Sequence, residues 1–511
     1  MLWIIKFSRK YVKLFENIFI KNSHLILEMS NKRQKIIQVL KNAGHSTTSH
    51  GLSHILKTKS IFLKFMWILF LFSSCGSCCY LIATSIMNFL KWEVVTKIDI
   101  VTEIPSIFPT ISICTANPIQ NNFSLNFVDQ VLKGSGISNN SWFESNGINY
   151  QFKFLFSKYL SMSNVYNLSD QERENFGMKI NKSIISCYYS TNPCNLSLDF
   201  EYHYDNMHSN CIKFNSGKKT ELKKASKPGL INGLQMEIYV DEPNENSLST
   251  ASGLYLIVHN NSQESHFPEG FTVPVGKQVN IAVQREFISK KARPYSECTQ
   301  NLDSVNAFDS DLYRTIIQSG KPYRREMCYD LCLQEIIIEK CKCQDMISYS
   351  FPNMSYCMSL NHIFCDYEEF SHFYTENIEE KCGRKCPLEC DTIKYPVTLT
   401  YLDYPTEAYY NKLIKEPIFK NMSGLTYEKL KKKMIFLNIY YSEFQYKKIQ
   451  EVEKMTIIDL VAGIGGTMGL FIGISFLSLI EIIHVAFEIV FVILENEKNT
   501  NKVQTVLVGS K

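Results

Sequence analysis

The sequence predicts an α+β membrane protein, in which two membrane-spanning helices flank a large, disulfide-rich extracellular domain. Two long apolar segments, 61–90 and 457–494, stand near the two ends of the 511-residue chain. Fourteen of the 17 cysteines lie between them, from Cys114 to Cys390. Short runs rich in Ile, Val and Thr, bounded by Asn, Pro or Gly, occupy much of the same interval and are typical of β-strands.

The composition and the motifs of the chain disfavour several classes of function. With 45% hydrophobic and 13% aromatic residues, the chain can bury a large core, and its length favours more than one structural unit. The net charge of +4 is too small to indicate nucleic acid as a partner. No nucleophile elbow, zinc-protease motif or phosphate loop is present, so an ectoenzyme is the weakest hypothesis and no cofactor is expected.

Residues 1–60 are predicted to form a cytoplasmic N-terminal region. Charged residues interrupt the first 30 positions throughout, so we expect no cleavable signal peptide. Residues 1–64 contain 12 Lys and Arg but two acidic residues, which predicts a cytoplasmic N-terminus by the positive-inside rule. Residues 1–30 suit either an amphipathic helix on the membrane surface or a poorly ordered tail.

The first span is predicted at residues 61–90, and its middle is rich in Ser, Gly and Cys, which suits close helix contacts in lipid. Cys75 and Cys78 have thioredoxin-type spacing, but inside an apolar span small-residue packing is the better interpretation. With a second span at 456–494, the loop 91–455 is extracellular and the tail 495–511 is cytoplasmic. This topology implies a multi-pass protein of the plasma membrane.

Glycosylation sequons agree with this topology. All eight N-x-S/T motifs fall between the two spans. The expected acceptors are Asn122, Asn139, Asn167, Asn181, Asn195, Asn260, Asn353 and Asn421. Strands are expected in residues 91–114 and again from Gly233 to residue 287, in a mixed or antiparallel sheet, whereas residues 120–230 show no clear periodicity.

Ten cysteines are concentrated in residues 298–390. Thiolates at short spacings also bind zinc, but an extracellular segment without C-x-x-C pairs favours disulfides, so no metal is expected. Cys328 and Cys332, and likewise Cys382, Cys386 and Cys390, are spaced by one helical turn. Facing pairs at i and i+4 on two helices would cross-link in register and staple a helical subdomain.

The second apolar segment, 457–494, is too long for one straight crossing of a hydrocarbon core of about 30 Å. It carries four ionisable residues, Asp459, Glu481, His484 and Glu488, and such residues at membrane depth indicate a pore or a transport path. Ser478, Glu481, His484 and Glu488 recur every three or four residues and predict a polar stripe on one helix face. Several copies of the chain are then needed to surround it with water.

Glycines accompany this stripe. Gly465, Gly469 and Gly473 are four residues apart, a spacing that permits tight helix crossing. Packing is one interpretation. In the other, Gly473, Ile474 and Ser475 unwind, and their backbone and hydroxyl groups narrow a pore. Packing alone leaves the acidic residues unexplained, so we favour the pore.

Four motifs resemble the degenerin, epithelial sodium channel and acid-sensing channel family, in the order in which they occur there. Residues 465–475, GGTMGLFIGIS, with Glu481 beyond them resemble its second membrane segment with the G-x-S filter. His50 and Gly51 resemble its His-Gly motif, and residues 108–114, FPTISIC, resemble its post-membrane motif. The ten-cysteine block resembles its thumb and palm cysteines.

The resemblance implies a trimer of subunits, homomeric or with related chains, each with two membrane helices and a hand-shaped domain of palm, thumb and knuckle. It implies Na⁺ as the permeant ion and block by amiloride. Gly473, Ile474 and Ser475 would form the filter, with Glu481, Ser478 and His484 lining the pore below. His50 and Gly51 would lie in the cytoplasmic vestibule, and Ala462 and Gly463 would match a position whose enlargement holds degenerin channels open.

Seven disulfides are also implied by the resemblance, which spacing alone leaves undetermined. The implied pairs are Cys114 with Cys211, Cys187 with Cys194, Cys298 with Cys390, Cys328 with Cys386, Cys332 with Cys382, Cys341 with Cys365, and Cys343 with Cys357.

Departures from the family pattern concern the stimulus. Trp92 and Tyr295 stand where acid-sensing members have a Tyr and a Trp in contact, which suits a mechanical link. Glu93 and Val94 replace histidines there, so a histidine proton switch is absent at this point. Acidic residues in the thumb, Asp366, Glu368 and Glu369, are better interpreted as a solvated face than as proton sites. His484 replaces an Asp, which weakens cation attraction in the inner pore.

The leading hypothesis is a sodium channel opened by an extracellular ligand, peptide or force. An ATP-gated trimeric channel shares the two spans but lacks the G-x-S and His-Gly motifs. A non-conducting receptor or auxiliary subunit that requires partners is the alternative from a different class.

Overall fold

The structure, a computed structural model, divides into two compact units. One comprises the residues up to Glu93 and from Glu453 onward, and the other comprises Val94–Val452. The structure describes residues 33–44, 51–117, 121–134, 165, 168–205, 208–241, 251–261, 270–346, 349, 351, 354–375, 377–420, 422 and 424–508. The side chains of residues 52, 170, 360, 479 and 495–508 lie outside this description.

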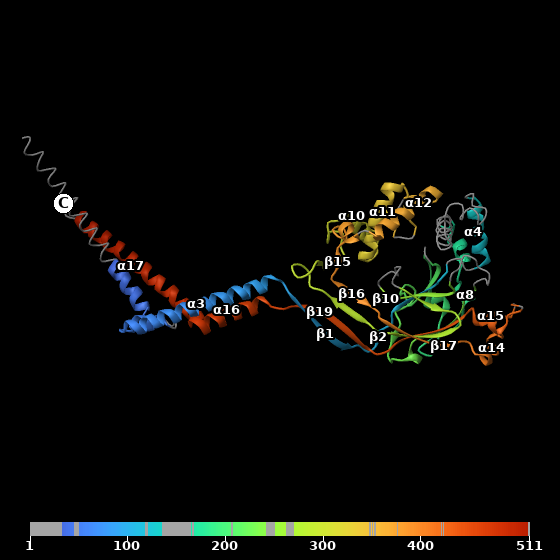
Figure 1. Cartoon of the computed structure of the whole chain (residues 1–511), viewed down its shortest axis with the longest axis horizontal. Helices are drawn as coiled ribbons and strands as arrows, with labels where there is room; N and C mark the ends of the chain where they lie inside the picture. Colours follow the sequence, from blue (N-terminus) through green and yellow to red (C-terminus); the bar gives the residue numbers. More distant parts are fainter. Residues whose placement is uncertain are drawn as a thin grey trace, which may run out of the picture. The chain divides into compact units, whose positions relative to one another are not determined.

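The first unit is helical. Residues 33–44 form a helix, followed by α2 (Leu52–Lys57), α3 (Ile61–Leu90), α16 (Ile457–Ile472) and α17 (Phe476–Val508). α3 occupies the residues predicted for the first span. α17 continues beyond Leu494, where the sequence predicted a separate tail. α3 and α16 lie side by side, so segments that are far apart in the sequence meet here (Figure 1).

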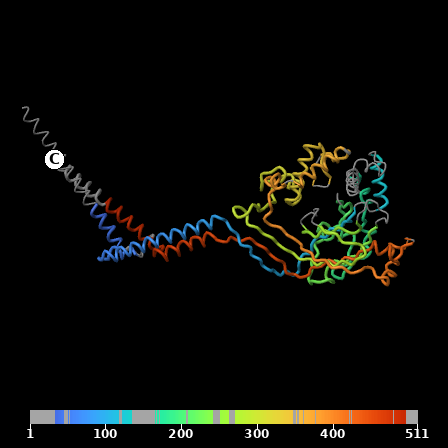
Figure 2. The backbone as a smooth tube through the Cα atoms, viewed as in Figure 1, coloured from blue at the N-terminus to red at the C-terminus, as the bar shows by residue number. Residues whose placement is uncertain are grey.

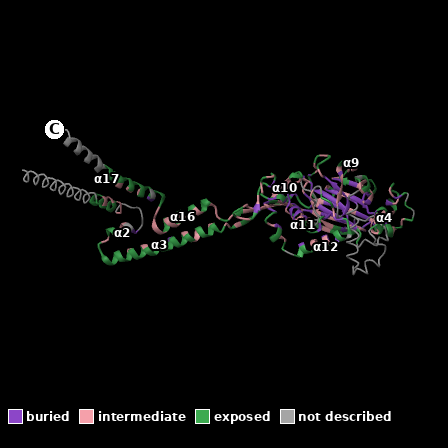
Figure 3. Cartoon of the chain, turned by 90° about the horizontal axis from the view of Figure 1, so that it is seen from above, coloured by how far each residue is buried: buried purple, intermediate pink, exposed green. Residues whose placement is uncertain are grey.

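These helices expose apolar side chains over most of their surface. Among the described side chains, Cys78 is buried in α3 and none is buried in α16 (Figure 3). Exposing apolar surface to water costs about 25 cal/mol per Å². α3 and the Phe476–Leu494 part of α17 are long and apolar enough to cross a membrane, and lipid would remove this cost.

The second unit contains three larger sheets and two strand pairs. The first sheet has the order β1-β19-β13-β16, the second β11-β10-β3-β7-β6, and the third β17-β12-β18-β9-β4-β5. The bounds of the first are β1 (Val94–Thr102), β19 (Gln445–Glu453), β13 (Glu286–Ser289) and β16 (Asp391–Lys394). The second contains β11 (Phe271–Pro274), β10 (Gly253–His259), β3 (Thr110–Thr115), β7 (Ser209–Phe214) and β6 (Phe200–Asp205). The third contains β17 (Val397–Asp403), β12 (Lys277–Val283), β18 (Met434–Tyr441), β9 (Leu234–Tyr239), β4 (Ile184–Tyr189) and β5 (Asn192–Pro193). The pairs are β2 (Ser106–Ile107) with β8 (Lys224–Ala225), and β14 (Cys298–Thr299) with β15 (Leu388–Glu389).

Both parallel and antiparallel pairs occur, as predicted for a mixed sheet. β12 runs parallel to β18 and antiparallel to β17. β12 alternates as its sequence indicates, with Val279, Ile281 and Val283 buried. The strands between residues 184 and 225 lacked such a signal. β7 is buried at every position, and a strand covered on both faces shows no alternation.

In Figure 2 the early and late parts of the chain run together within each unit, α3 beside α16 and β1 beside β19. β1 follows α3 directly and β19 precedes α16, so adjacent strands of one sheet lead into the two apolar helices.

The helices of the second unit lie outside the sheets. The larger ones are α4 (Asn122–Gly134), α10 (Asp311–Gln318), α11 (Arg325–Cys341) and α12 (Leu360–Thr375). The shorter ones are α7 (Asp170–Arg173), η1 (Glu174–Phe176), α8 (Ile180–Ser183), α9 (Leu196–Asp199), η2 (Leu230–Asn232), α13 (Ile378–Cys382), α14 (Glu407–Leu413) and α15 (Tyr427–Lys431). Helices α10 to α13 enclose a core of their own, in which Tyr313, Leu331 and Ile337 are fully buried.

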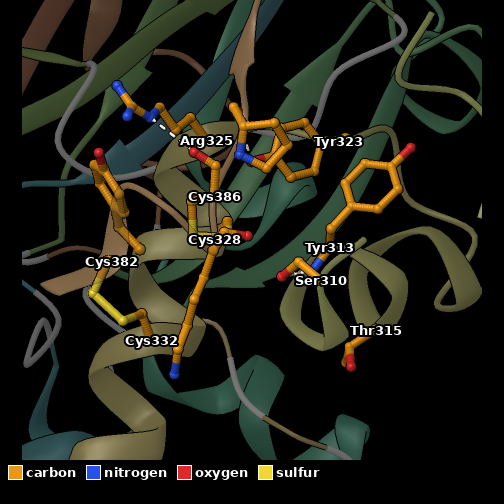
Figure 4. The surroundings of a disulfide bond; sticks show 12 residues. Ser310, Tyr313, Thr315, Tyr323, Arg325, Cys328, Cys332, Cys382 and Cys386 are labelled. Carbon is orange, nitrogen blue, oxygen red and sulfur yellow. Dashed lines mark hydrogen bonds between the residues drawn. A yellow bond between two sulfur atoms is a disulfide. The ribbon is translucent and has the colours of Figure 1, made fainter. Parts of the chain in front are cut away.

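The structure contains the seven disulfides that the family resemblance implied. Two of them join α11 to the segment around α13, and Figure 4 shows them beside the buried rings of Tyr313 and Tyr323. One detail of the prediction was wrong. α13 ends at Cys382, so Cys386 and Cys390 lie in turns rather than on a second helix.

Candidate pore-forming site

The second apolar segment is interrupted at residues 473–475, which lie outside both α16 and α17. Gly473 has a φ of 72°, and its N–H donates to the carbonyl of Gly469 at 3.1 Å. The N–H of Ile474 donates to the carbonyl of Met468 at 3.4 Å. The bond from Gly473 to Gly469 is that of an αL helix ending, in which glycine adopts the left-handed conformation without steric cost. The predicted break is therefore present where the sequence placed it.

Ser475 and Ser478 begin the next helix. The hydroxyl of Ser475 accepts the N–H of Ser478 at 3.4 Å, and the hydroxyl of Ser478 accepts the N–H of Ser475 at 3.1 Å. This reciprocal pair is a capping box, which satisfies donors that the first turn of a helix leaves unpaired. Both hydroxyls were predicted as pore groups. Within a single chain they hold the start of α17, a role that the S-x-x-S pattern at a helix start could have indicated.

α3 contacts the break through one hydroxyl. The Oγ of Ser74 donates to the carbonyl oxygen of Phe471, the next-to-last residue of α16. The last carbonyls of a helix have no partner within it, so this bond satisfies a group that the break exposes. The small residues predicted for packing in the first span thus also support the end of α16.

Asp459 has a structural role that the sequence analysis did not predict. Its Oδ2 accepts the N–H of Thr456 at 2.9 Å and the hydroxyl of Thr456 at 2.7 Å. The hydroxyl of Thr456 accepts the N–H of Asp459 in return. This capping box begins α16, and it accounts for Asp459 without a pore. Whether this residue also lies at membrane depth stays a prediction.

An ion pair lies where the two apolar helices meet the strands. The Nζ of Lys454 is 2.6 Å from Oε2 of Glu93, and the Lys454 N–H donates to the Glu93 carbonyl at 3.0 Å. The Lys454 ammonium lowers the pKa of the Glu93 carboxyl. A carboxylate in an ion pair stands where acid-sensing relatives were expected to have histidine.

Three ionisable residues of α17, Glu481, His484 and Glu488, are at least partly exposed within one chain. His484 and Glu488 are exposed, and Glu481 is partly exposed. Their spacing places them on one face of the helix. This is the polar stripe that the sequence predicted, and its function as a pore lining stays a prediction.

The small residues of α16 face open space. A Cβ built at Gly463, Gly465, Gly466 or Gly469 would have no neighbouring atom within 4 Å among the described residues. Ala462 is likewise exposed. The glycine stripe is thus not used against α3 inside one chain, although α3 and α16 pack together.

The other predicted gating residues are spread over the chain. Gly51 is buried with a φ of 88° and precedes α2, whereas His50 lies outside the described residues. Trp92 has a φ of 52° and packs on Phe89 with ring centroids 5.0 Å apart. Tyr295 belongs to the other unit, and its predicted contact with Trp92 stays a prediction.

Four of the predicted glycosylation sites are described. Asn122, Asn181 and Asn195 are exposed, as a glycan requires, and Asn260 is partly buried. Asn139, Asn167, Asn353 and Asn421 lie outside the described residues.

Buried carboxyl groups of the second unit were not predicted. Glu237 is 6% exposed and accepts hydrogen bonds from the hydroxyls of Ser186, Tyr404 and Tyr409 at 2.5 to 2.7 Å. Burial raises the pKa of Asp330 to about 7, and the nearby charges of Asp345 and Glu326 contribute.

The predicted solvated face on α12 was partly wrong. Asp366 is buried, and Glu369 pairs with Lys340 at 2.6 Å, whereas Glu368 is exposed. A run of acidic residues does not reveal which member of it points into the core.

Together, the two apolar helical segments, the glycine break and the disulfide-linked β-rich unit define a channel-like membrane protein with two spans. A family model described as amiloride-sensitive sodium channel matches residues 44–485. The chain belongs to this family. Its members are ion channels rather than enzymes, with Na⁺ as the permeant ion.

Curated relatives agree. The bile acid-sensitive ion channel of Homo sapiens is 23% identical over 464 residues, which cover 86% of this chain and 84% of the relative. Acid-sensing ion channel 1A of Danio rerio is 24% identical, covering 87% of both chains. The alpha subunit of the Mus musculus epithelial sodium channel is 25% identical over 61% of this chain and 43% of its own length. A solved proton-activated chloride channel covers 83% of this chain and 97% of its own at a TM-score of 0.31 and 6% identity, a likeness that carries no argument.

Proposed function

We propose that this chain forms a trimeric, sodium-selective and amiloride-sensitive channel in the plasma membrane, with both termini cytoplasmic. A peptide, another extracellular ligand or mechanical force opens it. The break at residues 473–475 inside an apolar segment carries this proposal. Non-helical backbone at membrane depth is tolerated where it is buried in protein or lines a water-filled cavity.

The filter consists of Gly473, Ile474 and Ser475 from each chain. Three copies of this turn form a ring of carbonyl and hydroxyl oxygens, which replaces part of the hydration shell of Na⁺. The hydrogen bond from Ser74 to Phe471 and the box between Ser475 and Ser478 hold the turn on both sides. Preorganised groups of this kind keep the ring from adapting to a larger ion.

Glu481 faces the permeating ions below the filter, and Ser478 and His484 line the same path. A stripe of polar groups on a lipid-exposed helix is costly, so trimer assembly places it around water. The cost of exposing Glu481 and Glu488 to lipid thus favours assembly.

Ala462 and Gly463 form the gate. Within one chain a Cβ at Gly463 has no neighbouring atom within 4 Å among the described residues, so we expect a larger side chain there to act on neighbouring copies. The vestibule roles of His50 and Gly51, and the link between Trp92 and Tyr295, follow from the family resemblance. The ion pair of Glu93 with Lys454 disfavours a histidine-based proton switch at this point.

Voltage-clamp recording of the chain expressed alone tests the proposal. Acid, neuropeptides and membrane stretch are applied in turn, and an inward Na⁺ current that amiloride blocks is the expected result. Gly463→Phe should give constitutive current, and Ser475→Ala should shift the Na⁺/K⁺ reversal potential. Ser73→Ala is the control in the neighbouring span. Silence of a chain that reaches the cell surface supports instead the auxiliary subunit that requires partners.

A further inference from the structure

A cavity of about 750 Å³ lies in the second unit, away from the apolar helices. Its walls come from the start of α4, residues 175–183 around α8, the end of β9, and Ile418 and Met422 beyond α14. Pockets that take small organic molecules have volumes of about 300–1,000 Å³. The cavity has the right size for such a ligand.

The charge of the lining is positive. Lys179 and Lys182 both line the cavity. The Nζ of Lys179 donates to the neutral amide oxygen of Asn175 at 2.7 Å. In the described part of the chain, neither lysine has a carboxylate within 4 Å. The carboxylate in the lining, Asp241, already has the ammonium of Lys433 at 3.5 Å. An anion therefore meets two uncompensated ammonium groups.

Part of the rest of the lining is apolar, and the other part consists of Thr115, Asn121, Asn175, Asn181 and Ser183. Met178, Tyr239 and Val240 are buried, and Ile418 is partly buried. Phe123 and Met422 stand at the cavity with 47% and 37% of their surface exposed. Covering such side chains is favourable at about 25 cal/mol per Å². The ligand that fits has one anionic end and an apolar body.

The floor of the cavity is connected to the second apolar segment. Tyr239 ends β9 and lies opposite Met434, the first residue of β18. The ring of Tyr239 packs edge-on against Phe419 at 5.3 Å. β18 leads through β19 into α16. A ligand that contacts Tyr239 and Ile418 thus contacts a strand pair that continues toward the glycine break.

We propose that this cavity binds a small amphipathic organic anion, a carboxylate or sulfonate with an apolar body, and that this ligand is an extracellular stimulus of the channel. The proposal rests on the proposed channel function for its second half. Its first half concerns binding alone.

Ligand-observed NMR on the full-length N181Q variant in lipid nanodiscs, which has no glycan acceptor at the cavity, tests binding without any current. The probes are 4-phenylbutyrate, 4-phenylbutylamine and 4-phenylbutanamide, which share a body and differ in charge. We expect saturable binding of the acid and binding at least about tenfold weaker for the amine and the amide, because a charge-assisted bond is worth about 1.5–3 kcal/mol.

Variants locate the site. K179Q with K182Q should weaken binding of the acid at least about tenfold, and Phe123→Ala should weaken it through the apolar end. The matched control is K224Q with K227Q, two exposed lysines outside the cavity, which should leave the affinity unchanged. Equal binding of acid and amine, absent saturation, or an unchanged affinity in K179Q with K182Q overturns the proposal.

Recording separates this proposal from the channel function. Applied to oocytes that express the N181Q variant, 4-phenylbutyrate should evoke a current that the same chain with K179Q and K182Q loses. If the ligand binds but no stimulus evokes a current, the binding site is supported and the proposal that the chain alone forms a channel is overturned. If another stimulus evokes a current but 4-phenylbutyrate does not bind, the binding site is overturned and the channel function is supported.

Discussion

The two units of this protein differ in where their stability comes from. The unit Val94–Val452 buries its apolar residues in several cores and closes seven disulfides within one chain. The helices of the other unit expose most of their described apolar side chains, and α16 and α17 each begin at a local cap. The unit Val94–Val452 is therefore internally complete, whereas the helical unit leaves apolar surface that lipid would cover.

The difference indicates how each unit responds to substitution. In the unit Val94–Val452, a buried group has partners from distant parts of the sequence, so its loss costs folding free energy. In the helical unit, most of the described side chains of α3 and α16 are exposed within one chain, so we expect their loss to act on assembly or conduction. The following variants test this contrast, from the largest expected effect to the smallest.

The largest effect is expected from a disulfide. Cys328→Ala with Cys386→Ala opens a bridge of sequence separation 58, and loop-closure entropy predicts a loss of about 4 kcal/mol in the free energy of unfolding. Thermal unfolding of the full chain in detergent measures it. The control, Cys75→Ala with Cys79→Ala, removes two free cysteines of α3 and should change it by less than about 0.5 kcal/mol. Equal losses in both pairs would contradict the comparison.

Asp330 makes the unfolding free energy depend on pH. Its pKa is raised to about 7 in the folded chain by burial, compared with about 3.9 when unfolded. Between these values the folded chain holds a proton that the unfolded chain has released. Stability is therefore highest below pH 4 and falls as pH rises to 7, by at most about 4 kcal/mol.

Melting temperatures from pH 4 to pH 8 measure this dependence. Asp330→Asn keeps an acceptor for the Tyr349 N–H and removes the titration, so the variant should be flatter across this window and more stable than the parent at pH 7.4. The matched control is Glu368→Gln on the exposed face of α12, which should follow the parent. If the melting temperatures of the parent and of Asp330→Asn rise together between pH 4 and pH 7, the raised pKa of Asp330 is refuted.

Glu237 should show a cost of similar kind but smaller size. Glu237→Ala leaves three hydroxyls without their acceptor, which predicts a loss of about 3 kcal/mol in the free energy of unfolding. Glu237→Gln retains an acceptor and should lose less. Asp403→Ala breaks an exposed ion pair with Lys277 and should cost about 0–1 kcal/mol. If Asp403→Ala proves as costly as Glu237→Ala, burial is not what distinguishes them.

The smallest effect is expected at the start of α16. Asp459→Ala removes half of a capping box, which costs about 1 kcal/mol of helix stability. Asp459→Asn retains an acceptor, so its single-channel conductance should equal that of the parent. Glu481→Gln is the comparison, because it changes a proposed ion-facing group and should lower the conductance. If Asp459→Asn lowers the single-channel conductance as much as Glu481→Gln does, Asp459 also faces the permeating ions.

Local signals in the sequence predicted the helical unit well. The length and apolarity of residues 61–90 predicted the bounds of α3. Gly473, Ile474 and Ser475 predicted the break, because a left-handed backbone position favours glycine whatever the tertiary contacts. The cap at Asp459 was also readable from the local T-x-x-D pattern of Thr456 and Asp459. It was missed because the sequence analysis considered only the cost of a charge in lipid. β7 was missed because burial on both faces removes the alternation that marks a strand.

By itself, the sequence determined the two apolar segments, the break between α16 and α17, and the cysteine framework, since each depends on contiguous residues or on a family pattern. The tertiary structure alone decided which carboxyl groups are buried and where a cavity opens. Glu237 bonds to Tyr404 and Tyr409 from about 170 positions away, and Lys179 and Ile418, which are still farther apart in the sequence, line one cavity. Such neighbours arise from sheet pairing and packing, which no local pattern of residues records.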